Sequence, residues 1–165
     1  MRAAATKNKL MKASTLYFCF ILLAFSGCTD KYAVIDTNTE IPNRNWSYAN
    51  TLKFDVNIAD EKEAYNVYMN LRVTADYKYS NMFVLVAQSA TKKVSHVQRY
   101  ELTLANREGM WLGNGSGNLY SYQLRFINHY KFPAKGLYHF YIEQNMRDNP
   151  LREVSDVGLR VEKAR

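Results

Sequence analysis

Apolar and polar residues alternate along most of this chain, which is the pattern of β-strands that have one face in water. The alternation is clearest in five segments, 52–58, 67–73, 100–104, 138–146 and 157–161. A continuous apolar run at 82–87 predicts a central strand that is covered on both faces. Residues 119–132 mix aromatic and polar side chains, and their pattern is ambiguous.

Turn-forming residues separate these segments at the spacing typical of all-β domains. No stretch after residue 27 keeps the apolar period of an amphipathic helix. Tyr, Phe, Val and Thr, which favour strands, are abundant, whereas the chain has only three prolines and seven glycines. We therefore expect seven or more short strands and an all-β fold, an antiparallel β-sandwich of the jelly-roll or Ig-like kind.

Residues 1–27 have the layout of a cleaved, helical signal peptide. Four basic residues and no acidic one precede the apolar segment 16–25, which is too short to span a bilayer stably. The small residues Ser26 and Gly27 stand directly before Cys28, a junction that resembles the lipobox of bacterial lipoproteins, where the thiol is lipidated and the peptide is cut just before it. We expect a lipid on Cys28; the alternative is a membrane-anchoring helix with an incidental cysteine.

The segment that follows the expected lipid site is polar and has no strong period. We interpret residues 28–45 as a lipid-anchored tether, with 32–35 as a candidate edge strand, and we place the β-sandwich domain at 46–165. A mature chain of this length is sufficient for one domain with its own hydrophobic core.

Removal of the signal peptide changes the charge of the chain. It takes four of the 22 basic residues and leaves 18 against 15 acidic ones, so the net charge falls from +7 to near +3. The longest basic run is the pair Lys92 and Lys93, so the basic stripe of a nucleic-acid-binding protein is absent from the sequence. Cys19 is lost with the signal and Cys28 would carry lipid, which leaves no thiol for a disulfide, a metal or a nucleophile.

Catalytic and cofactor motifs are weak in this sequence. The glycine-rich segment 111–118 lacks the Lys-Ser/Thr pair of a phosphate-binding loop, so we interpret it as a tight structural connection with Trp111 at the sandwich edge. His96, His129 and His139 have no partner at metal-ligand spacing or beside a nucleophile. We expect no enzymatic activity, no cofactor and no metal.

Thirteen tyrosines are the most unusual feature of the composition. Tyr65, Tyr68, Tyr77 and Tyr79 cluster within two predicted strands and a loop. Exposed tyrosines suit contacts with protein or sugar, because they offer a large area at a small cost in side-chain entropy. The simpler explanation, that tyrosine is a good strand residue with a polar end, stays open.

Several phrases of the sequence are similar, in order and spacing, to one known family. They are YNVYMNLR (65–72), DYKYSN (76–81), WLGNG (111–115), QNMRDNPL (144–151) and DVGLR (156–160). They resemble the GldH family of gliding-motility lipoproteins over essentially all of the mature chain. The resemblance implies a lipoprotein of the Bacteroidota envelope that is needed for gliding in motile members. It also implies a role in envelope assembly or type IX secretion in relatives that do not glide, and no enzymatic activity.

We therefore expect a palmitate-carrying lipoprotein of the outer membrane that contacts other envelope motility or secretion proteins, on either the periplasmic or the outer face. A surface glycan-binding lipoprotein is the alternative. The candidate partner-binding residues are Tyr77, Tyr79, Trp111, Arg147 and Asp148.

Residues 144–151 should leave a strand and form a turn at one end of the sandwich. Loops on a rigid scaffold are where binding residues concentrate, and Arg147 and Asp148 would point outward there. An internal turn network between Arg147 and Asp148, which only holds the hairpin, is the alternative.

Overall fold

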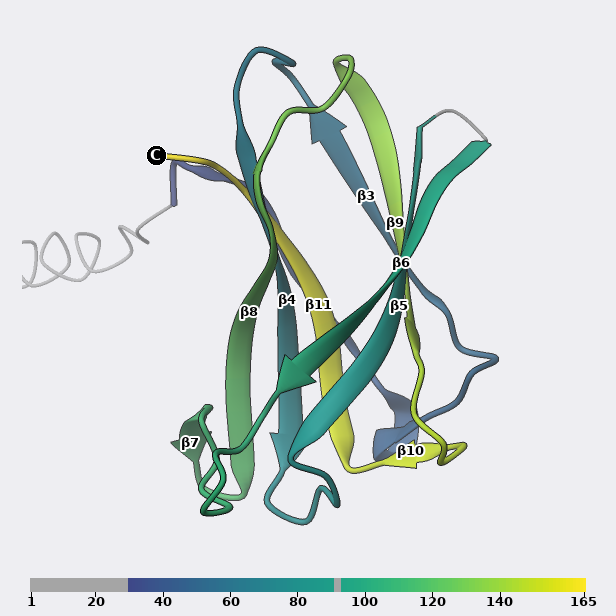
Figure 1. The fold of residues 1–165 in the computed structure, drawn as a ribbon, viewed down its shortest axis with the longest axis vertical. Helices are drawn as coiled ribbons and strands as arrows, with labels where there is room; N and C mark the ends of the chain where they lie inside the picture. Colours follow the sequence, from purple (N-terminus) through teal and green to yellow (C-terminus); the bar gives the residue numbers. More distant parts are fainter. Residues whose placement is uncertain (1–29, 91–92) are drawn as a thin grey trace, which may run out of the picture. The chain divides into compact units, whose positions relative to one another are not determined.

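The computed structural model describes residues 30–90 and 93–165, which form two large antiparallel β-sheets with one hydrophobic core between them and a third, two-stranded sheet (Figure 1). A compact unit runs from Tyr32 to Arg165. The expected signal peptide and Cys28 lie outside the described residues. No helix in the described ranges is long and apolar enough to cross a membrane. The predicted all-β, antiparallel sandwich fold is confirmed.

The first sheet has five strands in the order β1-β11-β4-β8-β7. Their bounds are Ala33–Glu40 (β1), Val154–Lys163 (β11), Tyr65–Thr74 (β4), Leu119–Tyr130 (β8) and Asn114–Ser116 (β7). The second sheet has four strands in the order β3-β9-β5-β6. Their bounds are Leu52–Ile58 (β3), Gly136–Gln144 (β9), Asn81–Ala90 (β5) and Lys93–Thr103 (β6). A short 3-10 helix, η2 (Pro42–Arg44), leads into β2 (Asn45–Trp46), which pairs with β10 (Leu151–Arg152).

Strand β3 shows how the alternation builds the core. Its apolar residues Leu52, Phe54, Val56 and Ile58 are buried, whereas the polar residues between them are exposed. Strands β4 and β11 bury their apolar residues in the same way, so the inner faces of both sheets share one core. Burial of each Val, Leu or Ile side chain stabilises the fold by about 1.5–3 kcal/mol.

Strand β5 differs from the prediction made for the apolar run. Met82, Val84 and Val86 are buried, but the apolar residues between them are only half-buried. Phe83 on that outer face is covered by the guanidinium of Arg99 from β6, which lies 3.7 Å from the ring centroid. The prediction that this strand is covered on both faces is therefore wrong, because a cationic side chain from the neighbouring strand shields its outer face instead of a second layer.

Residues 33–40 belong to the folded domain rather than to a tether. Strand β1 is an edge strand of the first sheet, and it pairs with β11 from Ala33, beside Glu162, to Glu40, beside Asp156. The compact unit begins at Tyr32, so the boundary expected at residue 46 lies well inside the domain. Only the segment before Tyr32 is left as a candidate tether.

Strand β1 approaches β11 closely because Gly158 has no side chain. Gly158 is the register partner of Asn38. A Cβ atom at Gly158 would overlap the backbone carbonyl of Thr37 and the side chain of Asn38. Glycine inside a strand often marks such a close approach of two backbones.

Candidate functional site

Three loops meet at one end of the sandwich (Figure 1). They connect β4 to β5 (75–80), β6 to β7 (104–113) and β9 to β10 (145–150). The predicted contact residues all lie in these loops: Tyr77, Tyr79, Trp111, Arg147 and Asp148. The fold therefore brings together residues from three distant parts of the sequence.

An aromatic cluster joins the first two loops. The ring of Tyr77 lies edge-on to Tyr79, with centroids 5.9 Å apart, and 6.4 Å from the ring of Trp111. Trp111 packs in turn on Tyr120 at 5.6 Å. Tyr77 is only 4% exposed, its hydroxyl donates to the carbonyl of Asn81 at 3.1 Å, and burial raises its pKa. Tyr77 thus supports the loops from inside and does not reach the surface that a partner would meet.

Asp148 links the third loop to the first. Its Oδ2 accepts a hydrogen bond from the hydroxyl of Tyr79 at 2.7 Å and lies 3.5 Å from the Nζ of Lys78. The hydrogen bond from Tyr79 is the main cause that lowers the pKa of Asp148, and the charge of Lys78 acts in the same direction. Asp148 is therefore ionised near neutral pH. Its contacts run across to the neighbouring loop, whereas the alternative expected from the sequence was a turn network with Arg147.

A buried glutamine holds the third loop in place. Gln144, the last residue of β9, is 0% exposed; its Oε1 accepts from the backbone N–H of Met146 at 2.8 Å, and its Nε2 donates to the carbonyl of Asp148 at 3.0 Å. Tyr48 reaches the same loop from another part of the chain. Its hydroxyl donates to the carbonyl of Met146 at 2.5 Å, and its backbone N–H donates to the Oδ1 of Asn149 at 3.0 Å. Hydrogen bonds from Gln144 and Tyr48 thus hold this loop in place.

Replacing Gln144 by leucine is expected to lower the free energy of unfolding by about 1–3 kcal/mol, because it leaves the N–H of Met146 and the carbonyl of Asp148 without their partner. Urea denaturation measures this change. The control is Gln123→Leu, which removes an exposed amide that donates to Asn70 at 3.1 Å and should cost under about 1 kcal/mol. Equal losses in the two variants would contradict the role of Gln144 in holding the loop.

A groove of about 740 Å³ opens beside Tyr79 and is lined by the first and third loops and by β10. Charged side chains of both signs stand around it: Asp76, Lys78, Arg147, Asp148, Arg152 and Glu153. Arg147 and Arg152 are exposed. A smaller groove of about 260 Å³ adjoins it and shares Tyr79 and Arg147. Such a mixed-charge surface on loops that are held in place suits selective contact with another polar macromolecule.

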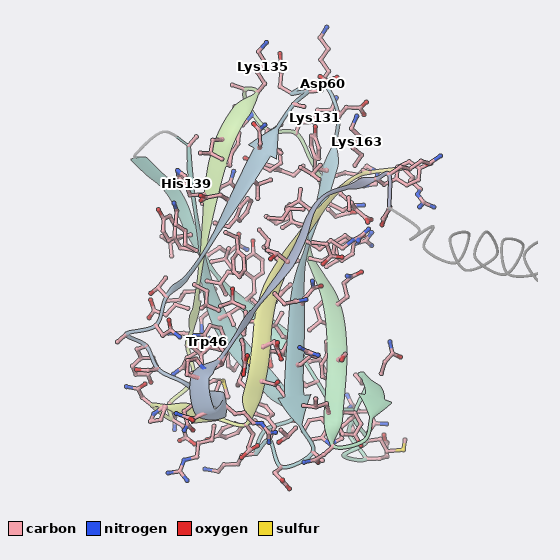
Figure 2. All side chains as sticks on the ribbon, turned by 180° about the vertical axis from the view of Figure 1, so that it is seen from behind. Trp46, Asp60, Lys131, Lys135, His139 and Lys163 are labelled. Carbon is pink, nitrogen blue, oxygen red and sulfur yellow. The ribbon has the colours of Figure 1, made fainter. Side chains whose placement is uncertain are left out.

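The other residues singled out from the sequence lie elsewhere. Cys28 is outside the described residues. His139 on β9 pairs with Asp55 on β3 at 2.6 Å, far along these strands from the loops (Figure 2). The glycine-rich segment forms β7 and a turn into β8, where Gly117 has a φ of +61°, as expected for a tight structural connection. Within residues 30–90 and 93–165, no group of three or more His, Cys, Asp or Glu is placed to hold a metal ion.

Three residues that shape the site were not among the predicted ones: Tyr48, Lys78 and Gln144. Gln144 carries a detectable signal, because it is a polar residue at an inward position of the β9 alternation, and a buried polar group needs hydrogen-bonding partners. Tyr48 has no such signal. It stands 98 residues before Met146 in the sequence, and no local pattern predicts their contact.

Comparison with known proteins identifies relatives along nearly the whole chain. The sequence model of the family described as GldH lipoprotein matches residues 33–161, a span that includes all three loops and both large sheets except the end of β11. The gliding motility lipoprotein GldH homolog of Christiangramia forsetii is 32% identical over 160 residues, which are 92% of this chain and 96% of the relative. The gliding motility lipoprotein GldH of Flavobacterium johnsoniae is 29% identical over 159 residues, which are 92% and 97% of the two chains. The resemblance found in the sequence is thereby confirmed, and the chain belongs to the GldH lipoprotein family.

Proposed function

We propose that this protein is a non-enzymatic lipoprotein of the cell envelope that acts in gliding motility, or in the associated type IX secretion machinery, by binding other envelope proteins. The names of its two relatives associate them with gliding motility. The observation that carries the proposal is the link between Tyr79 and Asp148, which holds two loops together beside a charged groove. A partner would meet a preformed surface, and little conformational entropy would be lost on binding.

The orientation of the aromatic rings favours a protein partner over a glycan. A sugar usually stacks on an open ring face, but the ring of Tyr79 faces Tyr77 and the ammonium of Lys78, which lies 5.1 Å from its centroid. The ring of Trp111 likewise packs against the rings of Tyr77 and Tyr120. The exposed groups around the groove are charged, and they suit complementary charges on another protein.

Lipid anchoring through Cys28 supports the same function. The compact unit connects to the preceding residues at Tyr32, whose carbonyl accepts from the backbone N–H of Lys163 at the end of β11. The three loops lie where β11 begins, so they are at the end of the domain remote from Tyr32. Attachment to the outer membrane through Cys28 would leave these loops accessible to other envelope proteins.

A charge reversal at the exposed Arg147 tests the proposed surface. In the native host, Arg147→Glu is expected to reduce gliding, or partner association where the host does not glide, several-fold, while the protein stays folded and abundant. Lys135→Glu is the matched control, because Lys135 precedes β9, whose far end leads to the loops (Figure 2). Lys135→Glu should leave gliding and partner association unchanged.

A photo-cross-linking side chain at each of these two positions identifies the partner directly. Position 147 should form adducts with envelope proteins, and position 135 should not. Adducts with glycan at position 147 would favour the alternative function, and normal gliding by Arg147→Glu would show that this surface is not the interface.

A further inference from the structure

Strand β6 forms an open edge of the second sheet. It pairs with β5 on one side, and no strand in the described ranges pairs with its other side (Figure 1). Residues 97–101 and Thr103 are exposed or half-buried, so this edge meets solvent. An open edge presents unpaired backbone N–H and C=O groups that another strand can bind.

The hydrogen-bond pattern shows which residues of β6 present those groups. Directly before β5, the carbonyl of Ser80 accepts from the N–H of Leu104 on the β6 side, whereas within β5 the carbonyl of Phe83 accepts from the N–H of Asn145 on the β9 side. Even-numbered residues of β5 therefore face β6, and their register partners in β6 are also even-numbered. The odd-numbered residues of β6 direct their N–H and C=O groups outward. They are Val97, Arg99, Glu101 and Thr103.

The charges along this edge are self-complementary in one register. Arg99 and Glu101 flank Tyr100, so an antiparallel pairing of two copies about Tyr100 places Arg99 opposite Glu101 of the second copy, twice. In the same register, odd-numbered residues of one copy lie opposite odd-numbered residues of the other, so their outward N–H and C=O groups can form hydrogen bonds with each other. Both side chains are exposed and lie on the outer face. Arg99 donates from Nε to Asn145 at 2.8 Å and Glu101 accepts from Asn81 at 2.7 Å, so each would exchange a neutral partner in its own copy for the opposite charge of the second copy.

We propose that a second copy of this chain docks on β6, and that the two β6 strands join the four-stranded sheets of both copies into one continuous sheet. The symmetric arrangement closes after two copies, as expected of an isologous contact. Charged residues on an edge commonly prevent pairing, but here the opposite charges face each other in the register that the backbone requires. A contact through one strand edge of each copy is expected to be smaller than a standard stable interface of about 1,600 Å² and to give weak association. Confinement to a membrane surface would raise the effective concentration of the two copies.

Charge reversal with a compensating swap tests the proposal on the full-length protein, purified in detergent. Arg99→Glu or Glu101→Arg alone places like charges opposite each other twice and should weaken dimerisation about tenfold. The double variant Arg99→Glu/Glu101→Arg exchanges the signs and should restore it. Analytical ultracentrifugation gives the dimer fraction, and circular dichroism verifies that each variant is folded. A monomer at every concentration, or a double variant no better than the single ones, would overturn the proposal.

Disulfide cross-linking in membranes tests the register independently. Residue 100 lies on the two-fold axis, where the two Cβ atoms of such a pair are about 4.5–5.5 Å apart, so Tyr100→Cys should cross-link to itself. Val97→Cys is the matched control, because position 97 faces position 103 of the other copy, so this variant should not cross-link above the wild-type background. Equal cross-linking at both positions, or a cross-link from position 100 to a different protein only, would refute the pairing of two copies.

Discussion

Replacing Cys28 by alanine is expected to abolish fatty-acid labelling of the protein and to release the domain from membranes, or to leave an unprocessed precursor. The residues Ser26 and Gly27 before Cys28 form the junction that motivates this expectation. Acyl chains bind membranes in proportion to the methylenes they bury, at about 0.8 kcal/mol each, and a single chain gives only marginal binding. Metabolic labelling with palmitate and fractionation of the envelope measure both effects.

The chain provides a matched control for this experiment. Cys19 lies inside the expected signal peptide, so Cys19→Ala should leave labelling and membrane attachment unchanged. Equal palmitate incorporation by the wild type and Cys28→Ala would remove the argument for an anchor at this residue. Loss of the palmitate label in Cys19→Ala, but not in Cys28→Ala, would show that the lipid is on Cys19.

Replacing Gly158 by valine is expected to lower the free energy of unfolding substantially. The Cβ would overlap the carbonyl of Thr37 and the side chain of Asn38, so β1 would have to move away from β11. Overpacking at such a site typically costs about 1–3 kcal/mol, and a branched side chain adds volume where even a methyl group does not fit. Chemical denaturation of wild type and variant measures the difference.

Two further variants separate the side-chain obstruction from the backbone obstruction. Asn38→Ala alone should change stability by less than about 0.5 kcal/mol, because Asn38 is exposed. Asn38→Ala together with Gly158→Ala should recover little of the loss caused by Gly158→Ala, since the carbonyl of Thr37 still overlaps the new methyl group. Full recovery would show that only the side chain of Asn38 obstructs the site.

The sandwich could be predicted from the sequence because most strands keep a strict period of two, as in β3, whose buried and exposed residues alternate without a break. Strand β8 could not be predicted from its alternation, because its register with β4 shifts near Val67. A bulge inserts one residue and reverses the phase of the alternation, so Phe126 and Ile127 are both half-buried although they are neighbours. Strand β1 was predicted only in part, as a candidate edge strand at 32–35, because most of its residues are exposed and its pairing with β11 depends on the bare backbone at Gly158.

The candidate site was only partly predictable. Turn residues and sequence phrases pointed to the loops with Tyr79, Trp111 and Asp148, and the fold places these loops together. The hydrogen bond between Tyr79 and Asp148 joins residues 69 positions apart in the sequence. The burial of Tyr77 depends on packing from other loops. Neither leaves a local pattern, because the first follows from the pairing of β5 with β9 and the second from packing between loops.

The pairing of β1 with β11 also sets the order in which this domain can fold. Strand β11 lies between β1 and β4, so the first sheet stays divided until the last strand of the chain is available. A chain that crosses a membrane from its N-terminus delivers that strand last. Sandwiches with such distant contacts fold in milliseconds to seconds. For an exported chain, the late arrival of β11 would leave the first sheet incomplete until translocation ends.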